Sequence, residues 1–153
     1  MYKRMMVPLD GSELAECVIP HVEAFLKAFS LSDVILACVV EPVIFPHRDE
    51  YFDPRKLAEQ EAVRKSSAKD YLEKVMKRLP NVGTALRAEV LAGRVTESLI
   101  DCAEQNQIDL IVIATHGRSG VTRWVRGSVA DRILRAAHVP VFMIRAPGTK
   151  GGI

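Results

Sequence analysis

Short apolar runs alternate with amphipathic segments along the whole chain. Strands are predicted at residues 4–9, 34–40, 86–90, 110–113 and 141–144. The second and fourth of these runs are apolar at every position, which is typical of strands buried on both faces of a parallel sheet. In the third run apolar and polar residues alternate, which favours an edge strand.

The segments between these runs carry apolar residues at helical spacing. Ser12 is a candidate N-cap for the first helix, in which Pro20 should produce a kink or a division. The second helix covers about residues 55–79, and the third follows Gly93. Ser128 opens the last helix with an acidic residue three positions later, a variant of the capping box. The predicted apolar helix faces include Val63, Val129 and Leu134.

Strands that alternate with helices predict an α/β fold, here a single-domain, doubly wound, Rossmann-like or flavodoxin-like sheet of five parallel strands with helices on both faces. We assign residues 1–146 to this domain and the Gly-rich residues 147–153 to a flexible tail. Ligands of such sheets bind beyond the carboxyl ends of the strands, where the strand order reverses. In the common strand orders, the first and fourth strands flank that point.

The composition of the chain argues against several classes of function. Hydrophobic residues make up 48% of the 153 positions, and a net charge of +2 is too small to favour nucleic acid or an acidic membrane as a partner. No run approaches the roughly 18 apolar residues of a membrane span, so we expect a cytoplasmic protein. The three cysteines, Cys17, Cys38 and Cys102, are too few and too far apart for a disulfide framework or a zinc site, and we expect free thiols.

The loop after the fourth strand is the most informative segment for function. It contains Gly117, Gly120 and Gly127 and leads into Ser128 at the start of a helix. Glycines let the backbone approach an anion closely, and the first turn of a helix offers free N–H groups, so this order predicts a phosphate site. The alternative is a connection whose glycines only shape a turn, but such connections are usually shorter than this one.

These residues resemble the nucleotide-binding motif of the universal stress protein family, in which three spaced glycines are followed by Ser or Thr. Gly117, nine intervening residues, Gly127 and Ser128 match the second and third glycines and the hydroxyl, while Ala114 replaces the first glycine. Residues 7–12 resemble the opening strand and turn of the family, and residues 138–145 resemble its closing strand.

The resemblance implies an adenine nucleotide as ligand, ATP or else AMP or ADP, whose phosphates could hold Mg²⁺. It implies that Asp10, preceded by Pro8 and Leu9, contacts the ribose and that the backbone of Val39 reads the adenine edge. The remaining contacts are assigned to the fourth strand, the loop and the last helix: Ile113, Ala114, His116, Gly117, Arg118, Gly127, Ser128, Val129 and Ala130. No catalytic and no metal-ligating side chain is assigned.

Three functions remain open from the sequence. The first is a nucleotide-dependent regulatory protein of the stress response, with little or no catalysis and a partner that the sequence does not identify. The second is a nucleotide-free interaction protein of the same fold, which Ala114 favours. The third is a slow ATPase or autophosphorylating protein, against which stands the lack of a Walker lysine motif.

Two segments bear on assembly. The last strand, from Val141 to Ile144, is apolar on both faces and lacks a lysine that would block edge pairing. The resemblance implies antiparallel pairing of this strand across a two-fold axis, which predicts a homodimer. Residues 41–54, with aromatic residues among prolines, predict either a lid or partner surface, or an ordinary loop.

Overall fold

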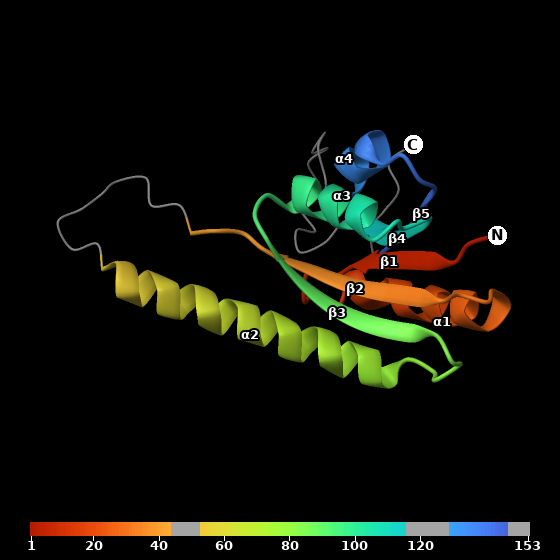
Figure 1. Ribbon diagram of the computed structural model, residues 1–153, viewed down its shortest axis with the longest axis horizontal. Helices are drawn as coiled ribbons and strands as arrows, with labels where there is room; N and C mark the ends of the chain where they lie inside the picture. The colour runs from red at the N-terminus through yellow and green to blue at the C-terminus, as the bar shows by residue number, and fades with distance from the viewer. Residues whose placement is uncertain (44–52, 116–128, 147–153) are drawn as a thin grey trace.

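Five parallel strands form one sheet in the order β3-β2-β1-β4-β5 in the computed structural model (Figure 1). The strands are β1 (Arg4–Pro8), β2 (Asp33–Val40), β3 (Ala85–Ala92), β4 (Leu110–Thr115) and β5 (Val141–Arg145). The structure describes residues 1–43, 53–115 and 129–146, so the predicted tail, residues 147–153, lies outside it. The sheet confirms the predicted fold class, with β3 at one edge.

Helices cover both faces of the sheet. On one face lie α1 (Ile19–Ala28) and α2 (Pro54–Arg78), and on the other lie α3 (Val95–Gln105) and α4 (Val129–Ala136) (Figure 1). The strand order explains this arrangement, because the chain crosses the sheet in one direction from β1 to β3 and in the opposite direction from β4 to β5. Right-handed crossovers then place the two pairs of helices on opposite faces.

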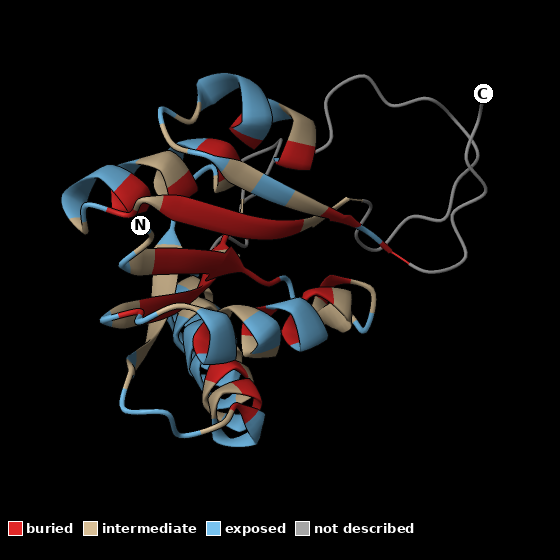
Figure 2. Cartoon of the chain, turned by 90° about the vertical axis from the view of Figure 1, so that its right-hand side faces the viewer, coloured by how far each residue is buried: buried red, intermediate tan, exposed pale blue. Residues whose placement is uncertain are grey.

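Each face of the sheet has its own hydrophobic core, because successive strand residues point to opposite faces. Met5 and Val7 belong to the core under α1 and α2, whereas Met6 belongs to the core under α3 and α4. All three are fully buried. Figure 2 shows the buried strands between helices whose outer surfaces are exposed. This double burial is the reason for the uninterrupted apolar runs in the central strands.

The chain between β1 and β2 forms two short helices, which confirms the predicted division at Pro20. A 3-10 helix, η1 (Ala15–Val18), leads into α1, and Pro20 is the second residue of α1. Proline fits there because the first N–H groups of a helix have no intrahelical acceptor. The prediction of Ser12 as the N-cap is wrong, because Leu14 is the N-cap of η1; Ser12 Oγ nevertheless accepts a hydrogen bond from the Ala15 N–H at 3.1 Å.

The long helix α2 packs on the sheet through only its second half, where Leu72 and Val75 are buried. Its first half extends beyond the sheet (Figure 1), and Val63 is 64% exposed, so the prediction that Val63 joins the apolar face is wrong. Helical spacing identified a stripe on the helix, but the width of the sheet decides how much of the stripe is covered. No helix within the described ranges is long and apolar enough to cross a bilayer.

The apolar face of α4 is narrower than predicted. Ala130 and Ile133 are buried, but Val129 is 36% exposed and Leu134 is 49% exposed. Leu134 lies about 100° further round the helix than Ile133, which turns it away from the sheet. The prediction that Val129 and Leu134 face the core is therefore wrong.

The two edges of the sheet differ in charge. On β3, the Arg87 guanidinium donates to both carboxylate oxygens of Asp33, with Nε at 3.0 Å from Oδ1, and its Nη2 donates to Asn106 Oδ1 at 3.1 Å. Glu89 lies on the same strand, 3.7 Å from Arg87 Nη1. On β5, the aromatic ring of Phe142 is exposed instead. Charged side chains discourage edge-to-edge pairing, and the charged residue of β5, Arg145, lies at its carboxyl end, so among the described residues β5 is the less protected edge.

Candidate functional site

The carboxyl ends of β1 and β4 lie next to each other, because β1 pairs with β2 on one side and with β4 on the other. Asp10 follows β1, and Thr115 is the last residue of β4. The helices that follow these two strands, α1 and α4, cover opposite faces of the sheet, which is the arrangement that opens a ligand crevice in doubly wound folds. The structure thus brings together the ends of the two segments that the sequence singled out.

The Asp10 carboxylate is held in place by one of its two oxygens. Asp10 Oδ1 accepts hydrogen bonds from the Ser12 backbone N–H at 2.9 Å and from Ser12 Oγ at 2.6 Å. Gly11 allows this tight turn with a φ of +82°, a conformation that other residues rarely adopt. No residue in the described part of the chain donates to Oδ2. Asp10 is exposed, so Oδ2 is available to a ligand.

The backbone N–H and C=O groups of Val39 face the region beyond the carboxyl end of β1. The Leu9 N–H donates to the Ala37 carbonyl at 2.8 Å, where the pairing of β1 with β2 ends. Successive residues of a strand direct their N–H and C=O groups to alternate sides, so those of Val39 point toward the β1 side, past the last paired residue. The Val40 carbonyl accordingly accepts from the Gly93 N–H on the β3 side, at 3.4 Å. Val39 lies in register with Leu91 of β3, but on the β1 side no residue within the described ranges pairs with it.

The remaining described residues of the predicted site form its walls. Pro8 and Leu9 are buried, and Leu9 belongs to the core under α1 and α2. Ile113 is buried in the other core, together with Ala130. Ala114 packs against the α1 and α2 core, so its methyl group points away from the face that carries α4.

Several predicted contacts lie outside the described residues. They are His116, Gly117, Arg118, Gly127 and Ser128, and their assignment to the phosphates stays a prediction. The structure describes α4 from Val129 onward, and the predicted start of the last helix at Ser128 also lies outside the described residues.

Three side chains beside the Asp10 turn were not singled out from the sequence. They are Glu16 of η1, and Tyr71 and Arg78 of α2. Arg78 Nη2 donates to Glu16 Oε2, and burial together with the Glu16 carboxylate raises the pKa of Tyr71. The seven-residue spacing of Tyr71 and Arg78 puts them on one face of α2, but no sequence pattern links that face to η1.

A cysteine also lies close to this turn. Burial raises the pKa of the Cys38 thiol, and the negative charge of Asp10 raises it further. Cys38 is therefore a protonated thiol near neutral pH rather than a reactive thiolate. Within the described ranges no group of three or more His, Cys, Asp or Glu side chains could hold a metal ion.

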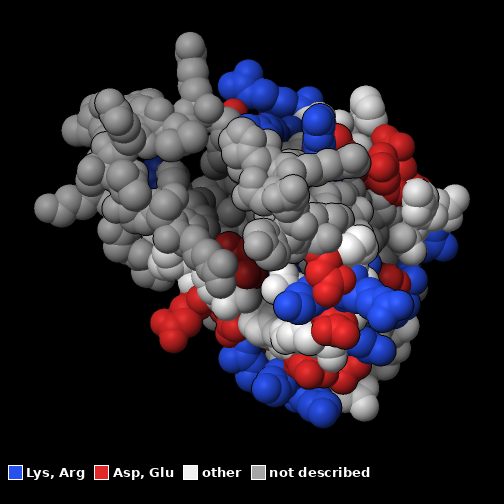
Figure 3. Space-filling view, turned by 90° about the vertical axis from the view of Figure 1, so that its left-hand side faces the viewer, with Lys and Arg blue, Asp and Glu red and all other residues white. Residues whose placement is uncertain are grey.

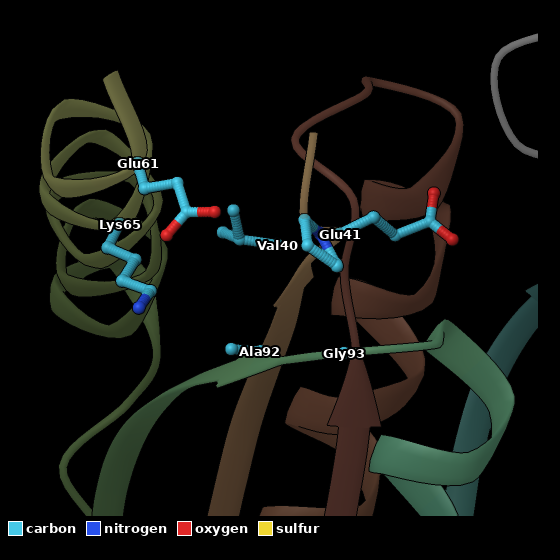
Figure 4. Close-up of a pocket in the computed structure, with 7 residues that line it drawn as sticks. Val40, Glu41, Glu61, Lys65, Ala92 and Gly93 are labelled. Carbon is cyan, nitrogen blue, oxygen red and sulfur yellow. The ribbon is translucent and has the colours of Figure 1, made fainter. Parts of the chain in front are cut away.

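A hollow of about 220 Å³ lies between α2 and the carboxyl ends of β2 and β3. Figure 4 shows Glu61 and Lys65 reaching from α2 toward this hollow; its lining consists of Val40, Glu41, Pro42, Glu61, Lys65, Ala92 and Gly93. On the neighbouring surface, acidic and basic side chains are interspersed rather than gathered by sign (Figure 3). No sequence pattern predicts this hollow, because it depends on how α2 lies against the sheet.

Comparison with known proteins matches nearly the whole chain. The sequence model of the universal stress protein family matches residues 1–145. The universal stress protein MJ0577 of Methanocaldococcus jannaschii is 28% identical, over 95% of this chain and 96% of the relative. The solved structure of MJ0577 superposes with a TM-score of 0.78 at 25% identity and covers 99% of both chains.

Two more distant solved structures share the fold and contain a nucleotide. One is a universal stress protein in complex with cAMP, 18% identical, with a TM-score of 0.70 over 95% of this chain and 98% of that one. The other is a universal stress protein family protein of Arabidopsis thaliana with AMP bound. It is 16% identical, with a TM-score of 0.61 over 95% of this chain and 93% of that one. At these identities the likeness establishes the fold alone.

Proposed function

The chain belongs to the universal stress protein family, and on this premise we propose that it binds an adenine nucleotide, ATP or else AMP or ADP, as a regulatory protein. The cAMP and AMP complexes of proteins with the same fold support an adenine ligand. A bound nucleotide can favour one conformation of the surrounding loops and thereby change which partner is recognised. The proposal assigns the protein little or no catalytic activity.

The free groups of Val39 and Asp10 carry the proposal. The backbone of Val39 offers one donor and one acceptor from the same residue, and adenine presents a donor beside an acceptor on its edge. The free Oδ2 of Asp10 is an acceptor of the kind that takes a ribose hydroxyl in other doubly wound sheets. These groups fit a nucleoside without any rearrangement of the sheet.

The phosphates belong, in this proposal, to the loop and the last helix. Gly117, Gly127 and Ser128 would bind them, together with the backbone N–H groups of Val129 and Ala130 at the start of α4. Ile113, His116 and Arg118 complete this side, and Mg²⁺ would be held by the phosphates themselves. When bound, the nucleotide supplies a polyanion, which the backbone N–H groups at the glycines and the Arg118 guanidinium can approach closely.

Ala114 favours a second candidate function, a nucleotide-free interaction protein of the same fold. Glycine is the motif residue at this position, and alanine has less backbone freedom. The methyl group, however, packs against the core under α1 and α2 and so points away from the α4 side. We therefore rank nucleotide binding first.

Binding measurements test the proposal directly. Protein purified without added nucleotide should release an adenine nucleotide on denaturation, identified by mass spectrometry. Calorimetric titration should show saturable binding of ATP at one site per chain. GTP should bind at least about tenfold more weakly, because guanine presents an acceptor where adenine presents a donor. If ATP does not saturate the protein at millimolar concentration, the interaction protein becomes the better explanation.

We also propose a homodimer through β5. Phe142 on this edge is 40% exposed and contacts Phe25, with ring centroids 5.3 Å apart, so an apolar surface continues from the strand onto α1. Antiparallel pairing of the strands from Val141 to Ile144 in two copies would satisfy the open backbone groups and cover that surface.

Light scattering should give a mass of about 34 kDa, twice the 17.0 kDa chain. Phe142→Lys places a charge on the edge and should return the mass to that of one chain. Val82→Lys is the matched control, because Val82 is 45% exposed but lies in the loop before β3. A dimer that survives Phe142→Lys, or a monomeric parent protein, would contradict pairing through β5.

A further inference from the structure

The hollow between α2 and the carboxyl ends of β2 and β3 has an apolar side formed by the strands. Val40, Pro42 and Ala92 line this side. Ala92 continues the row of alternate β3 residues that pack toward α2, so its methyl group faces the space. At about 220 Å³ the hollow is smaller than the roughly 300–1,000 Å³ of sites for drug-sized molecules, and it therefore suits a smaller ligand.

Two charged side chains, Glu61 and Lys65, lie on the helix side of the hollow. Figure 4 shows both reaching from α2 toward the space. They are four residues apart, a spacing at which Glu and Lys can pair on a helix surface, as Lys69 and Glu73 do at 4.0 Å. Within the part of the chain that the structure describes, however, neither Glu61 nor Lys65 forms an ion pair. A carboxylate and an ammonium group are thus both available beside an apolar surface.

A hydrogen bond joins the two sides of the hollow. Arg64 Nη1 donates to the Glu41 carbonyl at 2.9 Å, which fastens the first half of α2 to the chain that follows β2. The space also lies apart from the proposed nucleotide contacts, because the Val40 side chain faces α2 whereas the N–H and C=O groups of Val39 point toward β1. A ligand in the hollow therefore shares no contact with the nucleotide.

We propose that this hollow binds a small zwitterion, an α-amino acid with an aliphatic side chain. Its ammonium group pairs with Glu61 and its carboxylate pairs with Lys65. Its side chain packs on Val40 and Ala92, which removes apolar surface from water on both sides. An α-amino acid carries both charges on one carbon atom, and two residues one helical turn apart present the opposite charges close together.

L-valine is the probe, and amide spectra of the full chain measured by NMR during titration are the readout. The amide signals of Val40, Lys65 and Ala92 should shift and saturate with a dissociation constant of about 1 mM, as expected for so small a ligand. Valinamide lacks the carboxylate and isovalerate lacks the ammonium group. Each should bind at least about tenfold more weakly, because each leaves one charged side chain unpaired.

Substitutions of the two charged residues test the roles separately. Lys65→Met should lower the affinity for L-valine about tenfold and leave that for valinamide unchanged. Glu61→Gln should lower it similarly and leave the affinity for isovalerate unchanged. Ala92→Leu fills the space with both charges kept, and should abolish binding of all three molecules. Lys69→Met is the matched control, because Lys69 is 65% exposed, pairs with Glu73 and does not line the hollow.

Three results would overturn the inference. The first is the absence of saturable shifts up to about 10 mM L-valine. The second is equal affinity for L-valine and isovalerate, or an equal loss of affinity in Lys69→Met, since the two charges would then not select the ligand. The third is displacement of L-valine by ATP, which would place the amino acid in the nucleotide site. A protein that binds L-valine but not ATP would support this inference and contradict only the proposed function.

Discussion

Replacing Asp10 with asparagine is expected to weaken ATP binding by about 10- to 100-fold while the fold stays intact. A hydrogen bond to a charged group contributes about 1.5–3 kcal/mol, and Asp10→Asn replaces the ligand-facing Oδ2 with an NH2 group, which carries no charge and cannot accept. Asparagine keeps the Oδ1 acceptor, so the hydrogen bonds from the Ser12 N–H at 2.9 Å and from Ser12 Oγ at 2.6 Å can remain. The loss should therefore appear in affinity and not in stability.

Calorimetry with ATP measures this effect, and Asp53→Asn provides the control. Asp53 is the N-cap of α2 and accepts from the Arg55 N–H at 2.9 Å, which asparagine does equally well. The control should leave both affinity and unfolding unchanged. An Asp10→Asn protein that binds ATP as tightly as the parent would show that this carboxylate does not contact the ribose.

Leu36→Ala is expected to lower the free energy of unfolding by about 2–5 kcal/mol. Leu36 is fully buried in β2, paired in register with Val7 of β1 and Ala88 of β3, so neighbouring strands hold the cavity open. Domains of this size are stable by only about 5–15 kcal/mol, so this single change removes a large part of the total.

Urea unfolding followed by circular dichroism measures the loss at Leu36. Val63→Ala on α2 is the matched control, because Val63 is 64% exposed and should change stability by less than about 0.5 kcal/mol. A loss at Leu36 below about 1 kcal/mol would mean that the two-sided packing of β2 is not what stabilises the sheet.

The spacing of apolar residues along the chain was sufficient to predict the helices, the strands and the fold class. Uninterrupted apolar runs such as residues 34–40 require a strand with both faces covered, and that requirement alone implies helices on both sides. The alternation in β3 indicated an edge, and the structure has it there. Proline at position 20 indicated the boundary of α1, because its ring and missing N–H are tolerated only near a helix start.

The spacing of apolar residues gave wrong predictions of burial where burial depends on which part of the sheet lies against the helix. Val63 and Leu134 both fall on predicted apolar stripes, yet one lies on the part of α2 beyond the sheet and the other on the outer side of α4. A stripe of apolar residues gives the direction of a helix face, but not the extent of the surface that covers it.

For the site, the sequence determined which chemical groups are available, and the tertiary structure decided which of them meet. The Gly-rich loop, Asp10 and Ser128 could be named from the chain because small residues, a turn carboxylate and a helix start have local signatures. Whether the backbone of Val39 is free depends on where β1 stops beside β2, and Tyr71 reaches Glu16 only through the packing of α2. Both are contacts between segments distant in sequence, and side-chain periodicity within one segment carries no information about them.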